Sequence, residues 1–200
     1  VAAFTRLGDL LWERFRAVAV LLGGPGETGL ATESRKRCVA PAVDLIGSTS
    51  LPQLAAALGQ LRVLVTNDTG TLHLAAGLGL PSVALFLATA QPFDTGPYLE
   101  DCLCLEPDMP CHPCAFGVAC PHGHACREAI GPETVFAAMT PFFESERFGP
   151  GAYPGARAWV SVRDSRGFMD LSSLSGHDAE ARAVWLRLER QVFRQFLDGG

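Results

Sequence analysis

The chain has 200 residues, of which 48% are hydrophobic and 18% are charged, a balance typical of folded globular proteins. Its net charge of −5 argues against a general nucleic-acid binder, and no apolar run approaches the roughly 18–20 residues that cross a bilayer. The charge is uneven, because residues 1–146 hold eight basic and fifteen acidic side chains and residues 147–200 hold eight and six. The first residues carry charges among their apolar positions, unlike a signal peptide, and we expect the chain to be part of a longer protein.

The first half of the chain alternates short apolar runs with helical patterns. The helical patterns cover residues 4–15, a polar stretch that ends near Cys38, and residues 50–59 and 72–79. At the start of the third, Ser50 and Gln53 have the spacing of a capping box. Four buried strands are predicted at 17–22, 43–47, 62–66 and 81–86. Alternating strands and helices imply a parallel sheet with right-handed crossovers.

The second half is less regular. A strand is expected at 102–105, inside a loop-rich segment, and a helix from Gly131 through Phe142. After the Gly/Pro-rich linker 148–155, we expect a hairpin and then a final helix at 178–197. The hairpin strands are predicted at 158–162 and 167–171.

The final helix has two kinds of side chain at helical spacing. One face carries Trp185, Leu188, Val192 and Phe196. Arginines are frequent elsewhere on it, and a solvated face is the favoured interpretation, with contact to anionic lipid or acceptor phosphates as the alternative. They are Arg182, Arg187, Arg190 and Arg194.

Asn67-Asp68-Thr69-Gly70 lies between the strand at 62–66 and the next helix, three residues before His73. In a parallel sheet, ligands bind beyond the carboxyl ends of the strands, and a helix N-terminus there attracts phosphate. Gly70 lets an anion approach the backbone, and Thr69 and His73 offer donors. Asp68 repels phosphate and is better suited to sugar hydroxyls. Taken singly, each residue has a structural explanation, such as a helix cap.

Gly24-Pro-Gly-Glu-Thr-Gly29 fits the dinucleotide-binding spacing after the first strand. The helix that follows is polar, however, and the candidate ribose-binding acid, Asp44, lies near the start of its strand rather than at its end. We favour an interpretation in which Glu27 accepts hydrogen bonds from a ribose diol. An NAD-binding domain stays open as an alternative, recognisable by affinity for NAD over ADP.

The stretch TNDTGTLHLAAGLGLPSVALF closely resembles the donor-binding motif of glycosyltransferase family 9, the lipopolysaccharide heptosyltransferases. The likeness runs from about Leu10 to Thr140 and includes GGPGE, STSLPQLAAAL, TGPY and CREAIGPETV. The resemblance implies an α/β fold: a Rossmann-like parallel sheet with helices on both faces, the C-terminal half of a GT-B glycosyltransferase. We therefore expect a nucleotide-sugar-binding domain over 1–147, with a Cys-rich loop at 102–126, and a C-terminal hairpin and helix extension over 148–200.

The resemblance also implies roles for single residues. Asp68 contacts the donor sugar, Glu27 binds the ribose, and Thr49 matches a position near the adenine. The diphosphate is bound by Thr69, Gly70, Thr71 and His73. The family usually has Phe-Gly-Pro-Thr after the fourth strand, where this chain has Phe86-Leu-Ala-Thr89. We expect the family's N-terminal domain, which holds the acceptor site and the catalytic base, to lie outside these 200 residues, so no catalytic residue is expected here.

A second motif lies in the Cys-rich loop. Cys111, Cys114, Cys120 and Cys126 have C-x2-C-x5-C-x5-C spacing, and four thiolates at short spacing can close a tetrahedral zinc site. His112, His122 and His124 are further candidate ligands. The alternative is a set of free or partly paired thiols. A zinc ion bound here would be structural, since the resemblance implies a chemistry that needs no catalytic metal or other cofactor.

These features favour an inverting enzyme that transfers a heptose-like sugar from a nucleoside diphosphate, with ADP expected, to a lipopolysaccharide-core-type, lipid-linked acceptor. The expected partners are the nucleotide sugar, the missing N-terminal GT-B domain and the acceptor, without nucleic acid. We expect a cytoplasmic location, including a peripheral one at the inner face of the bacterial inner membrane. The alternative is a non-catalytic nucleotide- or zinc-binding module that serves a partner protein.

Overall fold

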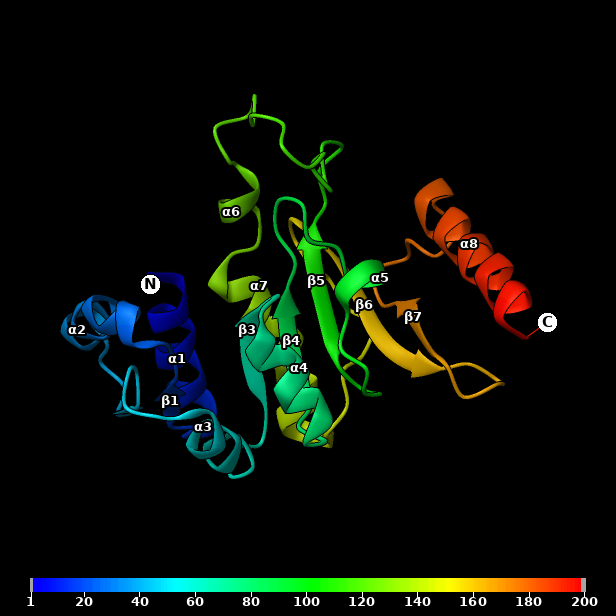
Figure 1. The fold of residues 1–200 in the computed structure, drawn as a ribbon. Coiled ribbons are helices and arrows are strands. Elements are labelled where there is room, and N and C mark those ends of the chain that lie inside the picture. Colours follow the sequence, from blue (N-terminus) through cyan, green and yellow to red (C-terminus); the bar gives the residue numbers. More distant parts are fainter. Residues whose placement is uncertain (1, 199–200) are drawn as a thin grey trace.

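Two sheets organise the chain (Figure 1). The computed structural model describes residues 2–198, apart from the side chains of residues 31, 35, 197 and 198. A small parallel sheet pairs β1 (Ala19–Leu21) with β2 (Ala42–Asp44). The larger sheet has the order β3-β4-β5-β6-β7, parallel from β3 to β5 and antiparallel from β5 to β7. Its strands are β3 (Leu64–Asn67), β4 (Ser82–Leu85), β5 (Leu103–Pro107), β6 (Ala156–Arg163) and β7 (Met169–Ser173).

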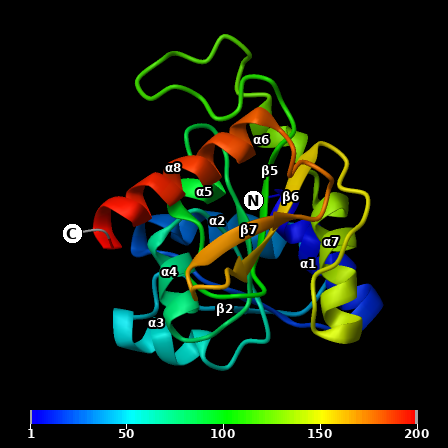
Figure 2. The same cartoon turned by 90° about the vertical axis from the view of Figure 1, so that its right-hand side faces the viewer.

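Helices lie on both faces of the larger sheet (Figures 1 and 2). In the described part of the chain, none is long and apolar enough to span a membrane. The helices of the described chain are α1 (Ala2–Phe15), η1 (Pro25–Glu27), α2 (Thr28–Arg37), α3 (Leu51–Leu58), α4 (Gly70–Gly77), α5 (Pro92–Thr95), α6 (Cys126–Ala129), α7 (Pro132–Ser145) and α8 (Ala181–Asp198).

The predicted α/β order is confirmed, with one difference in the sheet. The five strands expected in the first 147 residues all form, and the Ser50–Gln53 capping box is present, with Gln53 Oε1 2.8 Å from the Ser50 amide. The parallel strands are divided between two sheets, however, rather than joined in one. An apolar run fixes which residues are buried but does not choose the neighbouring strand, so the sequence could not reveal this division.

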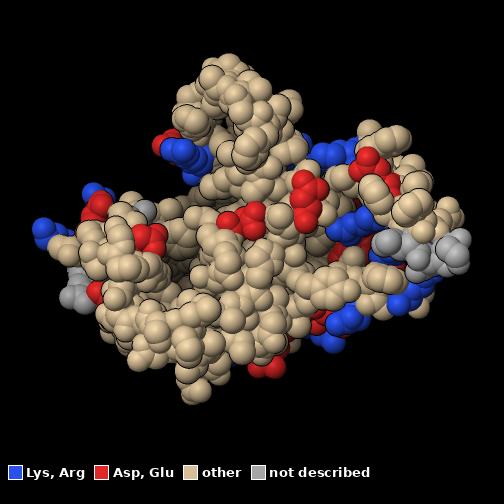
Figure 3. Space-filling model, in the orientation of Figure 1, with Lys and Arg blue, Asp and Glu red and all other residues tan. Residues whose placement is uncertain are grey.

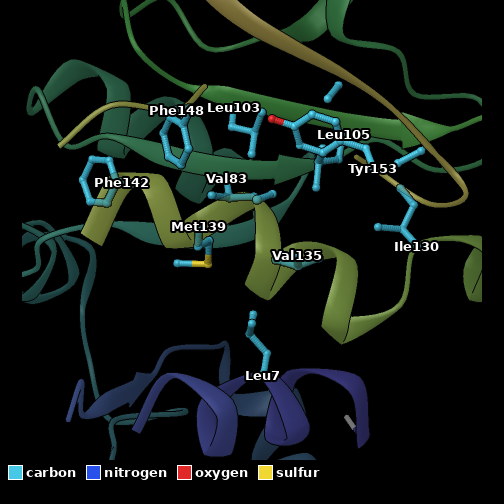
Figure 4. Close-up of a cluster of buried hydrophobic side chains, with 13 residues drawn as sticks. Leu7, Val83, Leu103, Leu105, Ile130, Val135, Met139, Phe142, Phe148 and Tyr153 are labelled. Carbon is cyan, nitrogen blue, oxygen red and sulfur yellow. The ribbon is translucent and has the colours of Figure 1, made fainter. Parts of the chain in front are cut away.

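One face of the larger sheet packs on α7 and α1 (Figure 4). Side chains alternate along a strand, so Val83 of β4 and Leu105 of β5 point to this face. Met139 of α7 is fully buried against them, and Leu7 of α1 reaches the same cluster. The rings of Phe15 and Phe143, 4.7 Å apart and stacked, join α1 to α7.

The opposite face packs on α4, α5 and α8. The intervening strand residues, Ala84 and Cys104, point there and contact a fully buried Leu72 from α4. Trp159 of β6 and Ala183 of α8 complete this cluster. The hairpin expected in the 148–200 extension is therefore part of the main sheet, with Trp159 paired opposite Cys104.

The linker before β6 depends on a glycine. Gly155 has φ +75°, and a Cβ there would lie 2.0 Å from the Ala129 carbonyl oxygen. Only glycine fits both the left-handed backbone and this close approach. The turn directs β6 back alongside β5 in the antiparallel direction.

The final helix, α8, turns toward the protein the face that was expected to be exposed to solvent. Its arginines, predicted to form a solvated face, are partly buried and bonded to the body of the protein. Trp185 and Phe196, from its apolar face, are 63% and 82% exposed. The periodicity identified two faces correctly, but acidic side chains elsewhere in the fold decided which one turns inward.

We expect Met139→Ala to lower the free energy of unfolding by about 2–5 kcal/mol, because it leaves a cavity between α7 and the sheet. Leu78→Ala is the matched control, since Leu78 is 47% exposed, and it should cost under about 1 kcal/mol. Urea denaturation measures both. Equal losses would contradict the assignment of Met139 to the core.

Candidate functional site

Asp68 lies at the carboxyl end of β3, and two neighbours orient its side chain. Its amide donates to the Leu85 carbonyl (3.2 Å), which holds it beside the end of β4. Its Oδ2 accepts a hydrogen bond from Thr95 Oγ1 at 2.8 Å, and its Oδ1 lies 4.0 Å from His73 Nε2. The side chain is 20% exposed, so the carboxylate is fixed while part of it still faces solvent.

The N-terminus of α4 is open beside this carboxylate. The Thr69 hydroxyl lies 3.3 Å from that of Thr66 and makes no capping bond to the helix. The cap explanation for these residues therefore does not apply, and the first amides of α4 have no side-chain cap. A Cβ built at Gly70 would contact nothing within 4 Å, and Thr71 follows in the same turn. Such a helix end can bind a phosphate.

Glu27 and Thr49 lie in the segments that follow β1 and β2: Glu27 ends η1, and Thr49 comes shortly before α3. Glu27 Oε2 accepts from the Gly24 amide at 2.7 Å, and a Cβ at Gly23 would lie only 2.9 Å from this oxygen. The Gly47 amide donates to the Gly23 carbonyl (2.9 Å) and so brings the segment before Thr49 to the same loop. In the described part of the chain, no hydrogen bond or ion pair joins these two residues to the Asp68 group. Their assignment to the same ligand stays a prediction.

Thr95 is a site residue that sequence reasoning missed. It ends α5, a single turn that was not predicted, and its hydroxyl reaches across to Asp68. It belongs to the TGPY segment, Thr95–Tyr98, which carries part of the family resemblance. That signal was available, but the 27-residue separation from Asp68 concealed the contact.

A buried charge cluster lies at the end of β5. Glu106 is fully buried and bonds to Arg182 of α8 and to the Trp159 indole N–H (3.0 Å). His112 Nδ1 lies 3.3 Å from Glu106 Oε2, and the His112 side chain is 1% exposed. His112 was expected as a spare metal ligand, but it points into the protein interior rather than toward the thiols. The only sign of this cluster in the sequence was a carboxylate at the end of an apolar run.

The pKa of Glu106 reflects two opposing influences. Burial raises it, whereas the bonds from His112, Arg182 and Trp159 lower it, and the net result is a pKa below the ordinary value. A carboxylate with a lowered pKa stabilises the fold above its unfolded pKa. That contribution is lost as the pH falls through the lowered value.

The four loop cysteines lie near one another. Burial, followed by the charges of Cys126, Cys111 and Cys120, raises the pKa of the Cys114 thiol. The His124 amide donates to Cys120 Sγ at 3.4 Å. Across residues 2–198, however, no group of three or more His, Cys, Asp or Glu side chains is arranged to hold a metal ion, so the zinc site stays a prediction.

The fold and this edge of the sheet define the class: an α/β protein with an oriented acid beside an open helix N-terminus, suited to an anionic, hydroxyl-bearing ligand. Comparison with known proteins agrees. The family model for glycosyltransferase family 9 (heptosyltransferase) matches residues 2–123. This chain therefore belongs to glycosyltransferase family 9.

Individual proteins are similar to parts of this chain. Lipopolysaccharide heptosyltransferase 1 of Pseudomonas aeruginosa is 34% identical over 118 residues, which cover 56% of this chain and 31% of that protein. The structure of E. coli ADP-heptose lps heptosyltransferase II matches with a TM-score of 0.58 at 22% identity, over 72% of this chain and 41% of the E. coli chain. This likeness supports the fold alone. A family 9 structure from Veillonella parvula is 30% identical, with a TM-score of 0.45, over 49% of this chain and 28% of its own. The chain thus spans about a third of the curated relative's length.

Glu106→Gln should lower the free energy of unfolding at pH 7 by about 1.5–3 kcal/mol, because it removes the carboxylate that pairs with the partly buried Arg182. The difference from wild type should shrink as the pH falls below the Glu106 pKa. Glu100→Gln, which breaks the exposed Arg163–Glu100 pair (2.9 Å), is the control and should cost about 1 kcal/mol or less. Urea titrations from pH 7 down to pH 3 measure both. A pH-independent difference would contradict the ionised role of Glu106.

The zinc hypothesis predicts about one zinc per chain in protein purified without chelator, measured by elemental mass spectrometry. Cys114→Ser should lower this content, and Cys38→Ser, which changes a cysteine outside the loop, should leave it unchanged. Metal-free wild-type protein would reject the site.

Proposed function

We propose that this chain is the donor-binding domain of an inverting glycosyltransferase. It would bind a nucleoside-diphosphate sugar, with ADP the favoured nucleotide and a heptose-like sugar, for transfer to a lipopolysaccharide-core-type acceptor. Family membership and the names of its relatives support this. The observation that carries the proposal is the Asp68 carboxylate, oriented by Thr95 and set beside the uncapped N-terminus of α4.

The two parts of the site would divide the ligand between them. The Asp68 carboxylate accepts hydrogen bonds from sugar hydroxyls, since an ionised acid has only acceptors to offer. The amides at Gly70 and Thr71 and the His73 ring N–H donate to the diphosphate. The positive end of α4 favours the charge that develops on the leaving diphosphate during transfer.

Transfer would begin when a base takes the proton of an acceptor hydroxyl. The acceptor oxygen then bonds to the anomeric carbon from the face opposite the leaving group, and the bond to the diphosphate oxygen breaks with inversion. We assign the base to a second GT-B domain outside these 200 residues. This chain contributes donor orientation and leaving-group stabilisation, and we assign it no catalytic metal. The protein would act in the cytoplasm on a lipid-linked acceptor.

Calorimetry with ADP, UDP, GDP and their sugars tests the proposal on the wild type and on two variants. Asp68→Ala should weaken the ADP-sugar by about 10–100-fold and bare ADP by much less, because it removes bonds to the sugar and relieves repulsion of the diphosphate. Thr95→Val should weaken the ADP-sugar by about 3–10-fold, because it frees the carboxylate to rotate.

Asp101→Asn is the matched control, an exposed acid before β5, at the opposite end of the strand from the site, and it should change neither affinity. Equal losses of sugar nucleotide and bare nucleotide in Asp68→Ala would reject the sugar-binding role. Tighter binding of NAD than of ADP would favour the dinucleotide alternative. Absence of nucleotide binding would leave a non-catalytic module as the better description.

A further inference from the structure

The outer surface of α8 is an apolar ridge. Within its 18 residues, six large apolar side chains are between 43% and 82% exposed. They recur at helical spacing on one side of the helix. The ridge consists of Val184, Trp185, Leu188, Val192, Phe193 and Phe196. Single exposed apolar residues are ordinary, whereas a contiguous set along a helix marks a surface that binds something.

The opposite face of α8 holds the helix in this orientation. Arg182 pairs with buried Glu106, and Arg194 pairs with Asp164 of the hairpin. Arg190 donates to the Phe93 carbonyl at 2.7 Å. Turning the ridge inward would break these bonds and leave the buried Glu106 carboxylate without Arg182. The ridge therefore faces outward because of specific polar contacts.

A basic pocket lies beside the ridge, between α8 and the β6–β7 hairpin. Its volume is about 460 Å³, and its charged lining is four arginines and two aspartates. These are Arg166, Arg187, Arg190, Arg194, Asp164 and Asp170, with a formal charge of +2. Arg187, Arg190 and Arg194 are paired with Asp178, Asp170 and Asp164, whereas Arg166 has no ion pair among the described residues. In Figure 3, blue and red side chains lie side by side at this end of the molecule, next to the tan surface of α8.

The dimensions of α8 argue against a second copy of this chain as the occupant. A helix of 18 residues is about 27 Å long and about 10 Å wide. Its ridge would bury roughly 300–500 Å² on each partner, below the roughly 800 Å² of a stable interface. Two copies would also bring like-charged pockets together. A lipid bilayer needs only an exposed amphipathic helix, and anionic headgroups complement the pocket.

We propose that the ridge of α8 and the adjoining basic pocket form a binding surface for an anionic lipid bilayer. The helix lies parallel to the membrane plane, with Trp185 and Phe196 inserted at the headgroup boundary, where aromatic side chains are favoured. Arg166, the exposed pocket arginine without an ion pair in the described part of the chain, binds a lipid phosphate. This surface is separate from the donor site and does not depend on the proposed sugar transfer.

Flotation of the 200-residue chain with vesicles tests the proposal. One set is phosphatidylcholine alone, and the other contains 30% phosphatidylglycerol. We expect binding to the anionic set, weakened by added salt. Trp185 emission should shift to the blue on binding, whereas Trp159 is fully buried and serves as an internal reference.

Two variants separate the apolar from the electrostatic contribution. The double change Trp185→Ser and Phe196→Ser should lower the partition coefficient about tenfold or more, and Arg166→Glu should weaken only the anionic preference. Val39→Ser is the matched control, 89% exposed on α2's C-terminal side, and should bind normally. Circular dichroism checks that each variant folds.

Three results would overturn the proposal. They are absence of vesicle binding, equal binding to both vesicle sets, and binding that the double variant leaves unchanged. Sedimentation velocity tests a second copy of the chain as the occupant. If the wild type dimerises with rising concentration and the double variant does not, the ridge binds a second copy rather than a membrane.

Discussion

The buried carboxylate of Glu106 is the interaction on which the arrangement of this chain depends. It sits at the end of a central strand, where it cannot be solvated, and so requires charged and polar partners. Arg182 comes from the final helix, Trp159 from the added hairpin and His112 from the start of the Cys-rich loop. One buried carboxylate thus links three segments to the end of β5: the final helix, the hairpin and the Cys-rich loop.

The same edge of the sheet carries the candidate donor site. Parallel strands end together there, so a short loop after β3 can place an acid, a hydroxyl and a helix end within reach of one ligand. Asp68 is useful because Thr95 orients it from another loop, and because neither Asp68 nor Thr69 caps α4. The first amides of α4 are left without a side-chain cap beside this carboxylate.

Much of the central unit could be predicted, because its signals are local. Short apolar runs between helical patterns predicted the strands, and the capping-box spacing of Ser50 and Gln53 predicted the start of α3. The polar gap at Asp68 pointed to the candidate site, whose role stays a prediction. What failed was non-local. The split into two sheets, the contact from Thr95 and the inward turn of His112 depend on pairings between residues far apart in the chain.

The sequence by itself determined the α/β alternation, the family and the chemistry available after β3, since these depend on periodicity and on residue types at short spacing. Only the tertiary structure decided which face of α8 is exposed. Its amphipathic pattern is compatible with packing either side inward, and an apolar ridge ordinarily packs on a core. Here the acids of the sheet edge and hairpin bind the arginine face, because a buried Glu106 without Arg182 costs more than an exposed Phe196.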